Sequence, residues 1–274
     1  MGDRRPTGSE LAPMSRIALR VASLVTLVFL YVPIATIALY AFNADRAQTW
    51  PIRRFTTDWF GVALANRDLV ASFVLSLQVG LVATLVALVL GSLAAFAIQR
   101  FRFFGRDSVS FLFVLPIALP GIVTGMALNA TINTAGVGFS AFTIAVGHAT
   151  FCIVVVFNNV VARLRRTSRS IEEASMDLGA DTWQTFRYVT FPSIRSALLA
   201  GALLAFALSF DEIIVTNFTA GTQETLPIWI FSSLTRATQR PIVNVAALFV
   251  IIISILPVYL AARLGGSGRQ LTAP

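Results

Sequence analysis

Long apolar runs, separated by short polar segments, dominate the chain. Residues 21–42 and 69–98 carry no charged side chain, and residues 108–162 lack one over a length sufficient for two crossings. Two further apolar runs lie near 195–215 and 242–262. Because a helix that spans a bilayer needs about 20 apolar residues, this pattern predicts an all-α polytopic membrane protein with six transmembrane helices.

We expect the run 108–162 to divide at residues 129–138, where Asn, Thr and Gly cluster as they do in turns. The third span then lies near 109–131 and the fourth near 141–162. The run 21–42 is longer than the apolar core of a signal peptide, which has about 7–15 residues. It is therefore interpreted as an uncleaved membrane anchor.

The distribution of basic residues predicts the orientation. All 21 are arginine, and 15 of them fall on the termini or in the loops after the second and fourth spans. The remaining 6 lie on the other side. Because cytoplasmic loops carry the excess of basic residues, both termini are expected in the cytoplasm.

This topology divides the chain into four parts. They are a cytoplasmic N-terminal tail (1–16), a first span with a periplasmic segment (17–66), a core of five spans (67–263) and a cytoplasmic C-terminal tail (264–274). The first tail is polar and basic, and we expect it to be disordered. The outer residues 43–68 contain Trp50 and Trp59, which suit a membrane interface.

Composition excludes several classes of protein. The chain of 274 residues is 56% hydrophobic and 12% charged, whereas a soluble domain averages about 25% charged. The absence of lysine excludes a P-loop, whose lysine must reach the nucleotide phosphates. Any ATP-Mg must then be bound by another subunit, and no cofactor is expected on this chain. The net charge of +8 follows from topology and anionic lipid, so no nucleic acid is needed.

Catalytic and metal-binding residues are not expected. Cys152 and His148 are the single cysteine and the single histidine, and both lie in an apolar run. A zinc site needs several such ligands. Both side chains are therefore interpreted as core residues, since Cys and His are often packed in cores.

A polar stretch between the fourth and fifth spans, residues 170–195, carries its own folding signals. Ser170 with Glu173 three residues later fits a capping box, in which a hydroxyl and a carboxylate satisfy free amides at a helix start. Gly179 suits a helix C-terminus, where a left-handed residue is favoured.

A second helix is expected directly after this turn. Asp181 with Gln184 offers another N-cap. Pro192 either ends that helix or opens the next span at a first-turn position. The pattern is typical of a rigid docking element, although an ordinary cytoplasmic loop with two short helices would also show it.

Particular residues of this stretch match a known motif. They are Glu173, Ala174, Ser175, Leu178, Gly179, Ala180, Phe186, Val189, Phe191 and Pro192. The stretch resembles the EAA loop of membrane permease subunits of binding-protein-dependent ABC importers. The usual motif has Ala where this chain has Ser175 and often Leu where it has Phe191, and both departures keep the size or polarity of the site. Residues 67–263 resemble the whole permease core.

The resemblance implies a MetI-like permease fold and a role in transport. Residues 170–195, called the coupling loop below, would fit a cleft on a separate ATPase subunit. The implied partners are ATPase subunits, a second permease subunit (identical or different) and an external solute-binding protein. Residues 115–125 and 209–227 are similar to the spermidine/putrescine subgroup, which implies a polyamine as the transported solute. Other small solutes stay open.

An acidic pair stands near the end of the fifth span. Asp211 lies 16 residues after Arg195, or about 24 Å along a helix, so it falls inside the bilayer. Asp211 and Glu212 are costly there unless they face a wet cavity or a partner. Two interpretations stay open: the carboxylates line a path for a cationic solute, or they cap a helix break or pair with a partner subunit.

A second group of candidates for the solute path lies around the third span. Pro120 and Gly121 indicate a broken helix, which at membrane depth lines a cavity or serves packing alone. Asn129 and Asn217 offer amide groups to the same region.

Other classes of function fit less well. A secondary transporter or channel is one alternative; such proteins often show an internal repeat, and none is apparent. A membrane enzyme would need clustered catalytic groups, which the chain lacks. A structural membrane partner without a path of its own is the remaining alternative.

Overall fold

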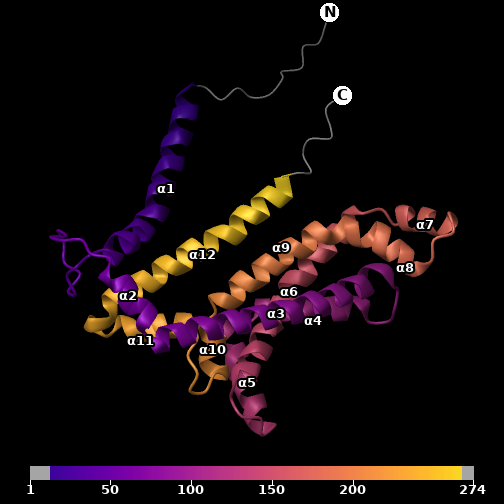
Figure 1. Cartoon of the computed structure of the whole chain (residues 1–274). Helices are drawn as coiled ribbons and strands as arrows, with labels where there is room; N and C mark the ends of the chain where they lie inside the picture. The colour runs from indigo at the N-terminus through magenta and orange to yellow at the C-terminus, as the bar shows by residue number, and fades with distance from the viewer. Residues whose placement is uncertain (1–12, 267–274) are drawn as a thin grey trace, which may run out of the picture.

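The computed structural model describes residues 13–266, which form a bundle of helices joined by short turns (Figure 1). Within these residues, β pairing is limited to one isolated antiparallel bridge between Asn43 and Phe55. The elements are α1 (Pro13–Ala41), α2 (Asp58–Ala65), α3 (Arg67–Arg100), α4 (Arg106–Ala118), α5 (Gly121–Thr134), α6 (Ala141–Arg166), α7 (Arg169–Asp177), α8 (Thr182–Thr185), the π-helical turn η1 (Phe186–Thr190), α9 (Phe191–Phe210), α10 (Ile214–Thr219), α11 (Leu226–Leu234), the 3-10 turn η2 (Ala237–Gln239) and α12 (Arg240–Gly266). The predicted all-α fold is confirmed.

Three long helices, α3, α6 and α9, lie side by side at the centre of the bundle (Figure 1). Their shared core is apolar and includes Ala87, Ala95, Cys152, Val156, Phe157, Val160, Leu164, Ile194 and Ala205. The helices α7 and α8 lie at one end of these rods, and α2 and α11 lie at the opposite end (Figure 1). The coupling loop is therefore an end cap of the bundle.

Glycine allows the central helices to approach closely. A Cβ atom on Gly91 of α3 would lie 2.8 Å from the carbonyl oxygen of Ile153 and 3.1 Å from the amide nitrogen of Phe157, both on α6. A Cβ on Gly201 of α9 would lie 3.3 Å from the Cα of Val156. Since lipid provides no hydrophobic drive between helices, such close contacts hold a membrane bundle together.

Most of the predicted spans correspond to described helices. Four helices are long and apolar enough to cross a membrane, and the bent pair α4–α5 adds a fifth. The four are Ile17–Ala41, Arg67–Arg100, Ala141–Arg166 and Thr182–Phe210. The sixth predicted span, 242–262, coincides with α12, whose described apolar part, Arg240–Ser254, is shorter.

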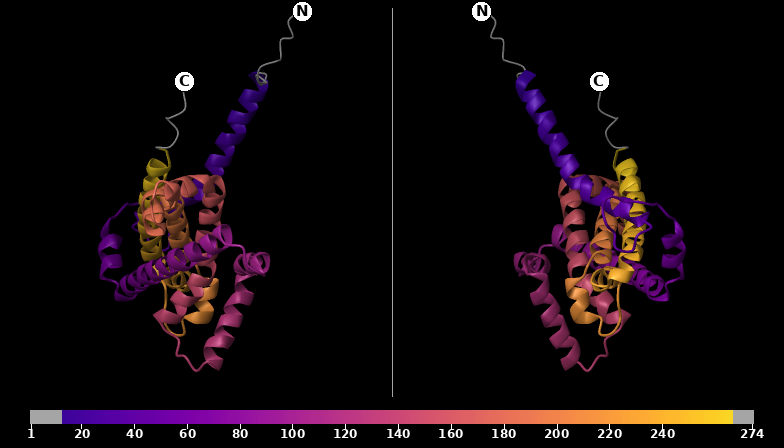
Figure 2. Two further views of the ribbon diagram at one scale, coloured as in Figure 1. Left: turned by 90° about the vertical axis from the view of Figure 1, so that its right-hand side faces the viewer. Right: turned by 90° about the vertical axis from the view of Figure 1, so that its left-hand side faces the viewer.

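The third predicted span, 109–131, is not one helix. Helix α4 ends at Ala118, α5 begins at Gly121, and their axes differ by 105°. Pro120 has no amide hydrogen, and it disfavours helical backbone at the preceding residue, Leu119, which is extended (φ −80°, ψ 142°). Helix α5 therefore projects from the side of the bundle (Figure 2).

The fifth predicted span, 195–215, is also corrected. Its helix begins earlier, continues from the coupling loop and ends at Phe210. Three residues then leave the helix before α10 starts at Ile214. The acidic pair lies in this interruption, which is called the helix break below (residues 211–213).

The segment between α1 and α2 folds back against α12. The indole Nε1 of Trp59 donates to the carbonyl oxygen of Asn43 at 2.9 Å. The amide Nδ2 of Asn244 on α12 donates to Gln48 Oε1, also at 2.9 Å. The Arg46 guanidinium lies 5.6 Å from the centre of the Trp59 ring. These contacts fix residues that the sequence placed only in an outer segment, and α2 itself was not predicted.

The predicted tails fall mostly outside the described residues. Residues 1–12 and 267–274 are not described. The expectation of disorder for 1–16 is wrong for its last four residues, because α1 begins at Pro13. Proline suits a first helical turn, where its missing amide hydrogen would have no partner.

The contact at Gly91 gives a direct test of this packing. We expect Gly91→Ala to lower the free energy of unfolding by about 1–3 kcal/mol, because the added methyl group meets α6 backbone that cannot move aside. Gly61→Ala on α2 is the matched control, since nothing lies within 4 Å of its Cβ position. Thermal unfolding in detergent micelles measures both. A Gly91→Ala protein as stable as Gly61→Ala would contradict the packing described.

Candidate functional site

The first helix of the coupling loop starts at a different cap from the one predicted. Helix α7 begins at Arg169, and its N-cap is Ser168, whose hydroxyl accepts from the amide of Ser170 at 3.3 Å. The predicted capping box of Ser170 with Glu173 is wrong. Ser168 has the extended backbone that an N-cap requires. Glu173 instead forms an exposed ion pair with Arg169, with 3.2 Å between Oε1 and Nε.

The turn after α7 has the predicted form. Gly179 has a φ of +91°. Its amide donates to the carbonyl of Met176 at 2.9 Å, and the amide of Ala180 donates to the carbonyl of Ser175 at 3.2 Å. These two bonds form a Schellman motif, which confirms the predicted C-terminus. The Ser175 hydroxyl also lies 3.3 Å from Thr185 Oγ1, so this small residue holds α7 against α8.

The second helix has the predicted cap but does not stop. Asp181 Oδ1 accepts from the amide of Gln184 at 2.8 Å, and Gln184 Oε1 accepts from the amide of Asp181 at 2.9 Å. Helix α8 then runs through η1 into α9, where the amide of Phe191 donates to the carbonyl of Phe186. Pro192 lies in the first turn of α9, so it opens the span. The π turn widens the backbone where the proline ring would otherwise clash.

A largely buried ion pair fixes α7 to the bundle. Glu172 Oε1 lies 2.8 Å from Arg100 Nη2 and accepts from Thr190 Oγ1 at 3.1 Å. The two charged side chains are 12% and 15% exposed. One carboxylate therefore joins α7, the end of α3 and η1. This role of Glu172 was not predicted, because spacing alone does not tell which of two adjacent glutamates faces inward.

An aromatic cluster supports the same junction. The ring of Phe186 has neighbours on three sides: Phe96 at 5.9 Å, Trp183 at 5.8 Å and Phe191 at 6.2 Å between centroids. Such pairs contribute about 0.5–1.5 kcal/mol each beyond area burial. The coupling loop is thus held to α3 and α9 by charge, hydrogen bonds and aromatic packing together.

The loop nevertheless leaves apolar side chains exposed. They are Ile171, Met176, Leu178, Trp183, Tyr188 and Phe191, and Leu178 at the tip of the turn is 90% exposed. Exposed apolar groups on a well-fixed segment mark an interaction site. Ala174 of the motif is exposed as well. The loop presents a rigid, partly apolar surface.

The helix break separates the roles of the two carboxylates. Glu212 is half-buried, and its Oε1 accepts from the amide of Val215 at 2.9 Å, which caps α10. Asp211 is exposed at the end of α9 and lines a pocket of about 220 Å³ whose other walls are mainly apolar. Asn217 is exposed on α10. Glu212 thus has a structural partner, whereas Asp211 faces open space.

Helix α5 brings the remaining candidates to α10. Asn129 Nδ2 donates to the carbonyl oxygen of Phe218 at 2.6 Å. A Cβ on Gly121 would lie 3.7 Å from Ile214. Pro120 is the N-cap residue directly before α5. These residues therefore join the bent helix pair α4–α5 to α10, next to the helix break. The side-chain amide of Asn129 is engaged in this helix contact.

The single histidine lies beside the helix break. His148 is buried, with Nδ1 2.7 Å from Ser209 Oγ and Nε2 2.7 Å from Thr216 Oγ1. Cys152 is buried one turn further along α6. The structure confirms both as core residues. The hydrogen bonds of His148 were not predicted, although an imidazole in an apolar span must find polar partners.

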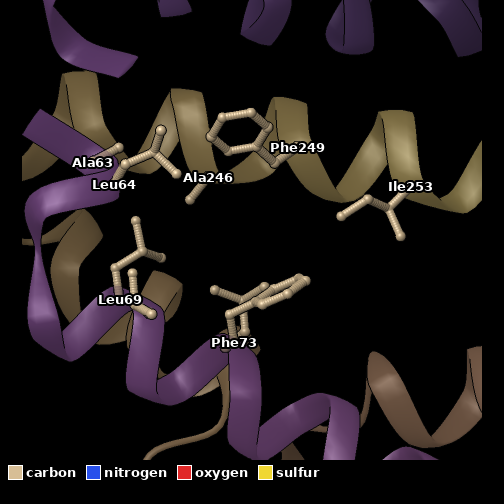
Figure 3. A pocket seen from close by; sticks show the side chains of 9 residues that line it. Ala63, Leu64, Leu69, Phe73, Ala246, Phe249 and Ile253 are labelled. Atoms are coloured by element: carbon tan, nitrogen blue, oxygen red, sulfur yellow. The ribbon is translucent and has the colours of Figure 1, made fainter. Parts of the chain in front are cut away.

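A further pocket, shown in Figure 3, lies beside α2 and α11, at the end of the bundle opposite the coupling loop in Figure 1. It has a volume of about 270 Å³ between α2, α3, α11 and α12, and its walls are apolar. Its lining residues are Ala63, Leu64, Leu69, Val70, Phe73, Leu226, Ala246, Phe249 and Ile253. An apolar cavity of this kind stays dry, so this pocket does not accommodate a charged solute.

The coupling loop and the helix break lie at the two ends of α9. That helix has 20 residues, which corresponds to about 30 Å. The structure does not bring the two candidate sites together, but one continuous helix connects them.

Comparison with protein families gives a match over most of the chain. Residues 87–266 match the family model described as "Binding-protein-dependent transport system inner membrane component". The putrescine transport system permease protein PotI of Escherichia coli (strain K12) is 35% identical over 248 residues, 86% of this chain and 87% of the relative. The spermidine/putrescine transport system permease protein PotC of Haemophilus influenzae is 32% identical over 251 residues, 90% of this chain and 96% of the relative.

The fold also occurs among solved structures. A chain of a bacterial alginate ABC transporter, solved in complex with an alginate pentasaccharide-bound periplasmic protein, superposes with a TM-score of 0.70. The match covers 95% of this chain and 96% of that chain at 14% sequence identity. At this identity the likeness establishes the fold, which is that of an ABC transporter permease.

The two adjacent glutamates of α7 give a matched test. We expect Glu172→Ala to lower the free energy of unfolding by about 3 kcal/mol, because Arg100 would be left largely buried without its partner. Glu173→Ala should change it by about 0.5 kcal/mol or less, since its pair with Arg169 is exposed. Thermal unfolding in micelles, with limited proteolysis of the loop, measures both. Equal effects of the two substitutions would contradict the anchoring role of Glu172.

Proposed function

This chain belongs to the binding-protein-dependent transport system inner membrane components, and from that premise we propose that it forms the path of an ATP-driven importer for a polyamine. It is a multi-pass membrane protein of a transport system. The coupling loop would receive force from a separate ATPase subunit, and the helix break would lie along the route of the solute.

The observation that carries this proposal is the construction of the coupling loop. It has defined caps at Ser168 and Asp181, a Schellman turn at Gly179 and a charged anchor at Glu172. It continues without interruption into a span. A segment that is stiff, joined to a membrane helix and apolar at its tip suits the transfer of movement from a docked partner.

The proposed partner subunits are inferred from the absence of lysine in this chain and from its transport-system relatives. Without lysine it cannot supply a P-loop, so ATP-Mg would bind to two ATPase subunits below the coupling loops. A second permease subunit, identical or different, would complete the path. A periplasmic solute-binding protein would deliver the solute, as in the alginate transporter solved with its periplasmic protein.

The arginine distribution supports an orientation for this assembly. The end of the bundle that carries the coupling loop also carries Arg163, Arg165, Arg166 and Arg169. Because basic residues accumulate on the cytoplasmic side, this end would face the cytoplasm, where ATP is available. The segment 43–57 and α11 would then face the periplasm.

A polyamine is the solute favoured by the relatives and by the charge at the helix break. The permeases with 31–35% identity over most of the chain are named for putrescine or spermidine/putrescine transport. Asp211 presents an exposed carboxylate at the end of α9. An opposite charge there would lower the barrier for an ammonium group leaving bulk water, whereas it would oppose an anionic solute.

The docking role predicts a defect in coupling without a defect in folding. We expect Leu178→Ser to weaken binding of the ATPase subunit by about 2 kcal/mol, the contribution of one buried leucine side chain, and to reduce uptake accordingly. Gly179→Trp should act more strongly, since φ +91° strains any side chain. Co-purification of the ATPase and uptake of labelled putrescine by vesicles measure the two effects.

Phe104→Ser is the matched control for these variants. Phe104 is a fully exposed apolar residue in the turn between α3 and α4, outside the coupling loop. Its loss should leave ATPase binding unchanged. Normal uptake by Gly179→Trp would count strongly against the docking role, and a thermal-shift screen of the solute-binding protein against polyamines would test the solute independently.

Neutralising the exposed carboxylate tests the path. We expect Asp211→Asn to reduce putrescine uptake about fivefold, because an exposed charge pair contributes up to ~1 kcal/mol. Stability should not change. Glu224→Gln, which removes an exposed carboxylate from the loop after α10, is the control. If both variants transport at the wild-type rate, Asp211 does not contact the solute.

A further inference from the structure

His148 is a buried polar side chain to which the transport role assigns no task. The side chain is 1% exposed. It belongs to α6, in which 67% of an 18-residue apolar stretch is buried, a larger share than in the other helices that could span a membrane. A neutral imidazole has one donor and one acceptor nitrogen. Both ring nitrogens of His148 have a hydrogen-bond partner at 2.7 Å, so the side chain makes all the hydrogen bonds that it can.

The hydrogen atoms of this cluster can be assigned from its contacts. Thr216 Oγ1 donates to the carbonyl oxygen of Glu212 at 2.8 Å. A hydroxyl has a single hydrogen to donate, so Thr216 must accept from His148 Nε2. The hydrogen of the neutral ring is therefore on Nε2. Nδ1 is then the acceptor, and Ser209 donates to it.

The neighbouring groups favour the same assignment. A serine within a helix commonly donates to the carbonyl four residues before it. For Ser209 that carbonyl belongs to Ala205, and it already accepts from the Cys152 thiol at 3.3 Å. The hydroxyl of Ser209 is thus directed to the imidazole. All hydrogen-bonding groups of the cluster are satisfied in this one arrangement.

The two partners of His148 lie on opposite sides of the helix break. Ser209 is in the last turn of α9, and Thr216 is in the first turn of α10. One side chain of α6 therefore joins the end of the helix that leaves the coupling loop to the start of the helix beyond the break. Asp211 and Glu212 lie between these two attachment points.

Helix α10 in turn is joined to α5 and α6. The hydroxyl of Thr143 at the start of α6 lies 2.8 Å from the carbonyl oxygen of Thr219 and 2.8 Å from that of Ser140, so the two carbonyls share its one hydrogen. The side-chain amide of Asn129 on α5 donates to the carbonyl oxygen of Phe218. A Cβ atom on Gly125 of α5 would lie 2.5 Å from the Phe218 ring. Movement of α10 would therefore carry α5 with it.

We propose that His148 is a positioning residue for transport: its bonds to Ser209 and Thr216 make α9, α10 and α5 move as one body across the helix break. This inference rests on the proposed function. Without these two bonds, residues 211–213 would still link α9 to α10 through the backbone, and α10 would stay in contact with α6 through Thr143. With the imidazole attached to both sides, a displacement of the coupling loop reaches Asp211 and the α5–α10 unit.

The experiment compares movement on the two sides of the break. Pairs of nitroxide labels are placed at Arg67→Cys with Leu204→Cys on α9, and at Arg67→Cys with Asn217→Cys on α10. All three positions are exposed. The background carries Cys152→Ser, which keeps a hydroxyl donor for the Ala205 carbonyl. Label distances are measured by pulsed EPR in the full importer, nucleotide-free and trapped with ATP and vanadate.

In the otherwise wild-type importer, we expect both label distances to change on trapping. In His148→Phe, the α9 distance should still change and the α10 distance should not. Putrescine uptake should fall about tenfold, the effect of one unsatisfied buried donor on an equilibrium, while the rate of ATP hydrolysis stays within about twofold. An α10 distance that still changes in His148→Phe would overturn the proposal.

Two further variants separate this role from a general need for the side chain in folding. Thr216→Val keeps the shape of the residue and removes one attachment, so it should reproduce the loss of α10 movement. His148→Gln keeps a donor and an acceptor and should restore uptake. If Thr216→Val transports normally with α10 moving, His148 is only a core residue. If neither distance changes even with His148 present, the coupling function fails and this inference fails with it.

Discussion

Inside a bilayer no water is available to backbone groups, so each interruption of a helix must find hydrogen-bond partners within the protein. The helix break satisfies this constraint with side chains of its own and of α6. The Glu212 carboxylate accepts from the amide of Val215, and the Thr216 hydroxyl donates to the Glu212 carbonyl. His148 Nε2 donates to the Thr216 hydroxyl. The break is therefore a defined structure rather than a frayed end. It places an exposed carboxylate, that of Asp211, directly at the end of α9.

The same constraint explains why the other end of α9 is stiff. Helix ends leave four amides and four carbonyls without intrahelical partners. In the coupling loop, Ser168, the turn at Gly179 and the box at Asp181 take up part of these groups. Glu172 then fixes α7 to α3. Beyond Pro192 in its first turn, α9 contains no further proline, the commonest cause of a sharp kink, so its remaining turns are suited to transmit displacement between its ends. Transport driven from outside the membrane needs such a connection.

Sequence patterns predicted the elements that depend on local chemistry. The apolar runs gave most spans, Gly179 marked a left-handed turn, and Asp181 with Gln184 marked a cap; the structure confirms these. They did not predict features that depend on contacts distant in the chain. Two serines stand at the start of α7, and only the backbone direction selects Ser168 over Ser170. Glu172 and Glu173 are equivalent in composition, and the position of Arg100 decides between them. Pro120 indicated a broken helix, but packing on α10 sets its 105° bend.

The acidic pair and the described pockets together argue that this chain forms only part of a path. Of the two carboxylates, Glu212 is engaged in capping α10, which leaves Asp211 to face outward. The pocket between α3 and α12 is apolar, and the pocket beside Asp211 is mainly apolar and only about 220 Å³ in volume. A polyamine carries several ammonium groups, each of which needs polar or charged neighbours when it leaves water. One exposed carboxylate supplies one such neighbour. In the proposed assembly, a second permease subunit opposite the helix break would supply further neighbours of this kind.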